Sequence, residues 1–219
     1  MPHPQRIGPF PVMNLPPHHD PRGQASPWVQ RFAPLVAKGG PVLDVACGGG
    51  RHARLFRGLG HPVMAVDIDT RGVADLAGQP GVTVCQADLE GGAPVDLGGS
   101  YAGIVVTNYL HRPLLAHLPG LLAPGGVLLY ETFAQGNQRH GRPSSPAFLL
   151  RQGELLAMAQ AAGLQVVAFE QGEISLPRAA VVQRLAAVRP LPAPDLDGDP
   201  EPRPLPLAYT LGWSESFGT

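Results

Sequence analysis

The sequence predicts an α/β fold in which helices cover both faces of a mostly parallel sheet, a three-layer α/β/α sandwich. Strand-like and helix-like segments alternate through five successive units. Runs such as IVV and VLL are apolar at every position, as is typical of strands buried on both faces. Only a short turn around Pro177 joins the last two strands. It is too brief for a parallel crossover, so they form an antiparallel hairpin at one edge.

The predicted elements follow from apolar runs and from the residues that bound them. Ser26 is a typical N-cap, Pro27 suits the first helical position, and Pro34 predicts a kink in the same helix. The strands are 42–47, 63–69, 82–89, 103–110, 125–133, 164–174 and 179–188. The helices are 26–40, 50–60, 70–78 with Thr70 as its cap, 112–122 with a break near Pro119, and 148–163.

The 219 residues suit one domain with extensions. Residues 1–25 are rich in Pro and polar groups without periodicity, which predicts a flexible N-terminal arm. The folded domain then spans 26–188, and 189–219 is a Pro-rich C-terminal tail.

Composition excludes several classes of function. A net charge of −1 gives no basic footprint and argues against a nucleic-acid partner. No apolar run approaches the length of a membrane span, no signal-peptide pattern is present, and the two cysteines form no disulfide framework. We therefore expect a cytoplasmic protein with a small-molecule substrate. The adjacent His18 and His19 lack the other ligands of a metal site, so no metal is predicted, and the oligomeric state is left open.

The stretch VLDVACGGGRHA places a glycine turn between a strand and a helix. Gly48 and Gly50 let the backbone approach a ligand closely, and amides at the helix start can hold an anionic group. Asp44 lies in the apolar strand before the turn. A buried carboxylate needs partners, which loop amides or a cationic ligand would supply.

Acidic residues recur where the next strands end. Asp67 lies 17 residues after Gly50, near the spacing at which a carboxylate accepts hydrogen bonds from ribose hydroxyls. Asp88 closes the following strand, where it can accept from an adenine amino group. In an open parallel sheet, ligands bind beyond the carboxyl ends of the strands. The series therefore predicts an adenosine-containing cofactor at this edge.

Two cofactors fit these residues. GGGRHA satisfies the dinucleotide fingerprint G-x-G-x-x-A, which would indicate an NAD-dependent oxidoreductase. A buried Asp44 beside a pyrophosphate is unfavourable, however, and it suits an ammonium or sulfonium charge better.

Four motifs resemble those of class I S-adenosylmethionine (AdoMet)-dependent methyltransferases. LDVACGGGR resembles the first motif, D/E-x-G-x-G-x-G, with Ala46 in place of the first glycine. AVDID and QADL resemble the second and third motifs, and LLAPGGVLLYETF resembles the Pro-Gly-Gly approach to the fifth strand. CGGGRHA, followed by the late helix, is similar to the tellurite-resistance (TehB-like) methyltransferases.

The resemblance implies a Rossmann-like, seven-stranded sheet with a reversed last strand. It also implies AdoMet as the cofactor, held at its methionine end by Asp44, Gly48 and Gly50. Asp67 would bind the ribose, and Asp88 with Leu89 the adenine. The expected cofactor site is completed by Ala46, Ile68 and Asn108.

Catalytic residues are expected after the fourth strand. Tyr109 is predicted either to shape the methyl pocket or to pack under the following helix. His111 is a candidate general base because imidazole titrates near neutral pH. Arg112 is a candidate for orienting an anionic substrate. The alternative for both is an ordinary surface turn.

The polar loop 134–146 follows the fifth strand and is predicted to be a lid or a solvated connection. As a lid, it would bring Arg139, His140 and Arg142 to an oxyanion or carboxylate substrate.

The predicted function is methyl transfer from AdoMet to a small molecule, such as a thiol, a selenol or a chalcogen oxyanion. The alternatives are an RNA or protein methyltransferase and a non-catalytic AdoMet-binding protein. An NAD-dependent oxidoreductase is the least favoured.

Overall fold

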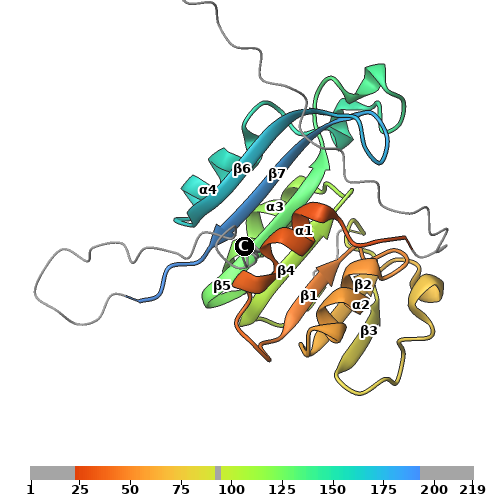
Figure 1. The fold of residues 1–219 in the computed structure, drawn as a ribbon, viewed down its shortest axis with the longest axis vertical. Helices are drawn as coiled ribbons and strands as arrows, with labels where there is room; N and C mark the ends of the chain where they lie inside the picture. Colours follow the sequence, from red (N-terminus) through yellow and green to blue (C-terminus); the bar gives the residue numbers. More distant parts are fainter. Residues whose placement is uncertain (1–22, 92–94, 193–219) are drawn as a thin grey trace, which may run out of the picture.

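A computed structural model describes residues 23–91 and 95–192. Seven strands form one sheet in the order β3-β2-β1-β4-β5-β7-β6 (Figure 1). Strands β1 to β5 pair in parallel, and β7 runs antiparallel to both of its neighbours, β5 and β6. The predicted seven-stranded sheet with a reversed last strand is confirmed. The strands are Val42–Val45 (β1), Val63–Asp67 (β2), Val82–Gln86 (β3), Tyr101–Thr107 (β4), Leu122–Phe133 (β5), Gln165–Ile174 (β6) and Ala180–Val188 (β7).

Helices lie on both faces of the sheet. Figure 1 shows α1 and α2 in front of it, while α3 packs on the opposite face. The α-helices are Pro27–Phe32 (α1), Arg51–Gly58 (α2), Arg112–His117 (α3) and Glu154–Ala161 (α4). The 3-10 helices are Ala33–Leu35 (η1), Thr70–Val73 (η2), Leu118–Leu121 (η3), Asn137–Arg139 (η4) and Pro146–Phe148 (η5).

Each face of the sheet has its own apolar core, because the central strands are buried on both sides. All four residues of β1 are buried, and their side chains alternate between the two cores. Val42 packs on the side of α1 and α2, while Leu43 packs on the side of α3 and α4. By the same alternation the Asp44 side chain lies on the α2 side of the sheet, so the strand places its carboxylate beside that helix.

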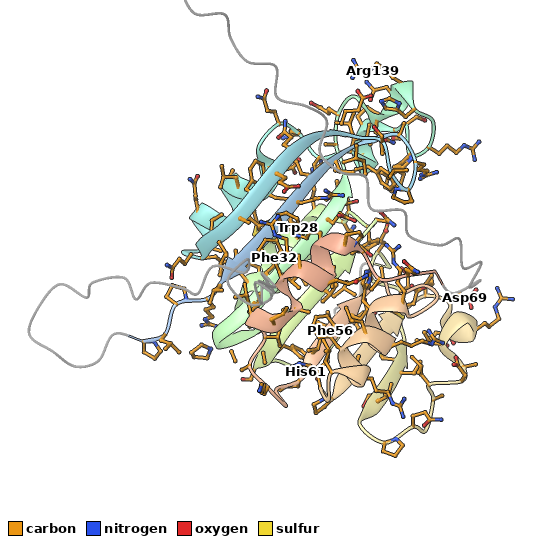
Figure 2. The ribbon with its side chains drawn as sticks, in the orientation of Figure 1. Trp28, Phe32, Phe56, His61, Asp69 and Arg139 are labelled. Carbon is orange, nitrogen blue, oxygen red and sulfur yellow. The ribbon has the colours of Figure 1, made fainter. Side chains whose placement is uncertain are left out.

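Helix α1 is fastened to the sheet at Trp28. The indole is buried and donates through Nε1 to the carbonyl of Leu185 in β7 over 3.2 Å. Its ring lies 4.6 Å from that of Phe32, centroid to centroid (Figure 2). Ser26 accepts from the Trp28 amide as the predicted N-cap, and the helix changes to 3-10 geometry at Ala33, next to the predicted kink at Pro34.

Several predicted boundaries are wrong. The predicted helix 70–78 is only the 3-10 turn Thr70–Val73, and its cap is Asp69, whose side chain accepts from the Arg71 amide. Helix α4 starts later than predicted, because Gly153 takes a left-handed conformation just before it. Strand β4 ends at Thr107, so the residues that follow it lie in a loop.

Other predictions fall outside the described residues. His18, His19 and most of the predicted N-terminal arm belong to 1–22, and most of the Pro-rich tail belongs to 193–219. The division of the chain into arm, domain and tail therefore stays a prediction. Within the described ranges, no helix has the length and apolar character needed to cross a membrane.

Candidate functional site

The turn after β1 is built from left-handed backbone conformations. Gly48 and Gly50 have φ of 53° and 73°, values that glycine adopts without steric cost. A Cβ on Gly48 would meet no atom within 4 Å, so open space lies in front of this residue. A Cβ on Gly72 of η2 would lie 2.8 Å from the Gly48 carbonyl oxygen, so Gly72 lets η2 approach the back of the turn. Sequence analysis missed this packing role of Gly72.

Ala46 also has a left-handed backbone, with φ of 52°. An L-residue other than glycine is strained there because its Cβ approaches the following carbonyl oxygen. The motif that this turn resembles has glycine at the same position. The alanine therefore keeps the shape of the turn at an energetic cost.

Asp67 joins the end of β2 to the glycine turn. One carboxylate oxygen accepts from the Gly48 amide over 2.7 Å, and the other accepts from the Asp69 amide over 2.9 Å. A carboxylate has about four acceptor positions, so each oxygen retains capacity for a ligand hydroxyl. The two amides fix the orientation of the half-buried Asp67 carboxylate, and so the directions in which its remaining lone pairs can accept.

Asp44 is buried beneath the turn and accepts from the Ala53 amide of α2 over 2.8 Å. Burial raises the pKa of Asp44 to about 7, although the Ala53 hydrogen bond and the Arg51 charge act in the opposite direction. The carboxyl group therefore titrates near neutral pH. A cationic ligand nearby would favour its ionised form.

The ends of β2 and β3 expose one apolar and one acidic side chain. Ile68 is 61% exposed, which is unusual for a large apolar residue beside a core. Asp88 is exposed after β3 and accepts from the Glu90 amide over 2.9 Å, while Leu89 is half-buried against the core.

The loop after β4 carries Asn108 and Tyr109. Asn108 has φ of 57°, which asparagine tolerates better than most residues, and its amide donates to the Glu131 carbonyl over 2.9 Å. The Tyr109 hydroxyl is buried without a hydrogen-bond partner among the described residues. Burial raises the pKa of Tyr109, and the charges of Glu90 and Asp88 raise it further. Tyr109 therefore faces the acidic ends of the strands.

Arg112 is fully engaged with the protein. Its guanidinium donates to both carboxylate oxygens of Glu154, over 2.7 and 3.0 Å, and to the carbonyls of Ala147 and Leu149, each over 2.9 Å. These contacts tie the start of α3 to α4 and to the segment before it. His111 is the half-buried N-cap residue of α3, next to this clamp.

The 134–146 loop lies against the β6–β7 hairpin. Asn137 accepts from the Val181 amide over 3.1 Å, and Glu173 lies within 3.9 Å of Arg139 and 3.5 Å of His140. The Arg142 carbonyl accepts from Arg178 over 3.4 Å. Figure 2 shows Arg139 at one end of the molecule, well apart from Asp69 near the end of β2. The structure therefore groups these three candidate substrate residues with the hairpin, away from the acidic strand ends.

Comparison with known proteins assigns a family. A family model described as a methyltransferase domain matches residues 18–169, more than half of the chain. The chain belongs to this methyltransferase family. No curated protein matches its sequence.

Solved structures share the fold of this methyltransferase at low sequence identity. A SAM-dependent methyltransferase from Methanosarcina mazei is 16% identical with a TM-score of 0.56, covering 77% of this chain and 99% of its own. TehB from Haemophilus influenzae is 16% identical with a TM-score of 0.60, and the match covers 74% of this chain and 61% of TehB. The 1,6-didemethyltoxoflavin-N1-methyltransferase of Burkholderia thailandensis is 20% identical with a TM-score of 0.56, and the match covers 78% of this chain and 77% of that enzyme. The predicted class I AdoMet-dependent methyltransferase fold is confirmed.

Sequence analysis missed Arg51 of the methyltransferase. This residue follows the three glycines directly and opens α2, where the helix dipole disfavours a cation. Its guanidinium donates to the Gln24 carbonyl over 3.4 Å and to the Thr107 hydroxyl over 3.3 Å, across the top of β1. A positive charge at the first position of a helix was the available signal, because the helix dipole disfavours a cation there.

A buried polar cluster connects α1 of the methyltransferase to the sheet, and sequence analysis missed it too. The Ser26 amide donates to His52 Nε2 over 3.1 Å, and the Ser26 hydroxyl donates to Glu131 over 3.1 Å. Glu131 also accepts from Arg184 of β7 over 2.6 Å. Burial lowers the pKa of His52 to about 3, with help from the Arg51 charge, so this imidazole is neutral at physiological pH.

Proposed function

We propose that this methyltransferase binds AdoMet at the carboxyl edge of β1, β2 and β3 and transfers its methyl group to a small molecule. The observation that carries the proposal is the Asp67 carboxylate, which two backbone amides hold beside the glycine turn with acceptor capacity left over. Ribose presents two adjacent hydroxyl donors, which match such an acceptor. The family and the fold support the same cofactor.

The residues present fit AdoMet along its length. The open space at Gly48 leaves room for the methionine part, with Gly50 and Ala46 shaping the same turn. Asp44, whose pKa lies near neutrality, can take up negative charge beside the ammonium and sulfonium groups.

The adenine would lie between the ends of β2 and β3. Ile68 supplies an exposed apolar surface for a flat ring, and Leu89 lines the inner side. Asp88 would accept from the exocyclic amino group. The unpartnered Tyr109 hydroxyl faces this acidic region, and Asn108 holds the loop beside it.

When bound, AdoMet would supply a methyl group on a sulfonium: the acceptor would attack the methyl carbon in line, and S-adenosylhomocysteine would be the leaving group. The protein has to orient the acceptor and exclude water. For a thiol or selenol acceptor, His111 takes the acceptor's proton from its position at the start of α3, just after β4. A deprotonated oxyanion needs no base. Arg112 holds that start in place through Glu154, so its role is positional.

The acceptor class we propose is a small thiol, a selenol or a chalcogen oxyanion. The likeness to TehB supports it, and the solved relative that holds 1,6-didemethyltoxoflavin and S-adenosylhomocysteine supports a small acceptor in general. If an oxyanion binds, Arg139, His140 and Arg142 can meet it only by leaving the β6–β7 hairpin, because Glu173 pairs with the first two.

Calorimetry tests the cofactor. We expect saturable binding of AdoMet and S-adenosylhomocysteine, and no binding of NAD or NADP. Asp67→Ala should weaken the binding of S-adenosylhomocysteine by roughly 10- to 100-fold in Kd, the effect of losing hydrogen bonds to a charged group. Asp96→Ala is the matched control, since Asp96 is an exposed aspartate that likewise accepts from a turn amide, at Gly98.

Unchanged affinity in Asp67→Ala would remove this residue from the site. Asp67→Asn keeps an oxygen that can accept from the Gly48 amide. It therefore distinguishes an effect of a distorted glycine turn from an effect of losing the carboxylate that would bind the ribose. Transfer of labelled methyl is then measured with tellurite, selenite and a panel of small thiols. Cofactor binding without transfer to any of them would contradict the proposed acceptor class.

A further inference from the structure

Thr107 stands at the end of β4 with two neighbours around its hydroxyl. Arg51 Nη2 lies 3.3 Å from Oγ1, and His52 Nδ1 lies 3.4 Å from it. The side chain is half-buried and faces the side of the sheet that α1 and α2 cover. Arginine can only donate, so one lone pair of Thr107 accepts from Arg51.

The tautomer of His52 decides the second contact. His52 Nε2 lies 3.1 Å from the Ser26 amide, which can only donate, so Nε2 is the acceptor nitrogen of the ring. In a neutral imidazole the proton is then on Nδ1. His52 is neutral because burial lowers its pKa to about 3. Nδ1 therefore donates to Thr107, whose second lone pair is also used.

With both lone pairs accepting, the Thr107 hydroxyl is left with its own proton to donate. Among residues 23–91 and 95–192, no acceptor for that proton lies within hydrogen-bonding distance. The Thr107 hydroxyl can therefore act only as a donor, and a ligand beside it could supply the acceptor.

Arg51 makes no direct ion pair in the described part of the chain, although its charge lowers the pKa of the nearby Asp44. Its hydrogen bonds go to the uncharged oxygens of Gln24 and Thr107, at 3.4 and 3.3 Å. The next arginine of α2 differs, because Arg54 is paired with Asp75 at 2.6 Å. Half-buried Arg51 thus presents a positive charge directly beside the Thr107 donor.

We infer that Arg51 and Thr107 together bind a carboxylate, with His52 as the positioning residue that makes Thr107 a donor. A charged donor and a neutral donor side by side match the two oxygens of a carboxylate. Arg51 follows the glycine turn directly, which places the pair at the methionine end of the cofactor. On the proposed function, which this inference rests on, the group bound is therefore the methionine carboxylate of AdoMet.

Two ligands that differ only in this group test the inference. S-adenosylhomocysteine carries the carboxylate, and its decarboxylated analogue, S-adenosyl-3-thiopropylamine, does not. We expect the wild-type protein to prefer S-adenosylhomocysteine by about 10- to 100-fold in calorimetric Kd. Arg51→Gln and Thr107→Val should each reduce that preference at least several-fold, mainly by weakening the binding of S-adenosylhomocysteine.

Further variants separate the roles of the individual residues. Thr107→Ser keeps the donor and should keep the preference. Arg57→Gln removes the same charge from the same helix and should leave it unchanged. His52→Leu should reduce the preference, whereas His52→Gln, which retains a donating amide, should recover part of it. Melting temperatures report any general loss of structure separately.

An unchanged preference in both Arg51→Gln and Thr107→Val would overturn the inference. Equal weakening of both ligands would also overturn it, because the residues would then support the turn rather than the carboxylate. If the wild-type protein binds neither ligand, the proposed function fails as well, and that result is distinct from binding without a carboxylate preference.

Discussion

At the scale of single residues, Ala46 shows how a turn keeps its shape when its motif departs from glycine. Its φ of 52° costs an alanine about 1 kcal/mol. Ala46→Gly should therefore raise the free energy of unfolding, by roughly 0.5 kcal/mol once the greater freedom of glycine in the unfolded chain is counted. Urea denaturation measures the change. Ala157→Gly, in the exposed middle of α4, should instead lower it by about 1 kcal/mol. Equal losses in the two variants would contradict a left-handed Ala46.

At the scale of secondary-structure elements, Arg112 joins α3 to α4 and to the segment before α4. Arg112→Ala should lower the free energy of unfolding by about 1–2 kcal/mol, because Glu154 and the carbonyls of Ala147 and Leu149 lose a shared donor, a loss that partial exposure to water moderates. The affinity for S-adenosylhomocysteine should stay unchanged. Arg112→Lys keeps the charge but not the fork of donors, so it should recover only part of the stability. Lost turnover with unchanged stability would instead favour the catalytic role that sequence analysis gave to Arg112.

At the scale of the whole molecule, the sequence predicts what depends on local pattern. The apolar strands and the acids that follow them could be placed at one edge because the carboxyl ends of parallel strands meet there. The docking of the 134–146 loop could not be predicted. It depends on contacts such as Asn137 to Val181, which are 44 residues apart and leave no periodic pattern. The tautomer of His52 likewise follows from its contact with Ser26, 26 residues away.

Two buried groups next to the glycine turn should give the stability of the whole molecule opposite dependences on pH. The pKa of Asp44 is raised to about 7, so between pH 4 and 7 the unfolded state binds fewer protons than the folded state, and stability falls as pH rises. The pKa of His52 is lowered to about 3, so between pH 3 and 6.5 the unfolded state binds more protons, and stability rises with pH. The two slopes oppose each other between pH 4 and 6.5.

Removing either group should therefore expose the slope of the other. Relative to the wild-type protein, the unfolding free energy of Asp44→Asn should rise with pH across this window, and that of His52→Gln should fall. Each change should be at most about 1.4 kcal/mol per pH unit. Denaturant titrations at half-unit intervals from pH 4 to 8 measure both, and other titrating groups cancel in the comparison with wild type. The His52→Gln difference should become constant above about pH 7.5, and the Asp44→Asn difference only near pH 8, one unit above the pKa of Asp44. Curves that stay parallel to the wild-type curve throughout would mean that neither group carries the shift that its burial implies.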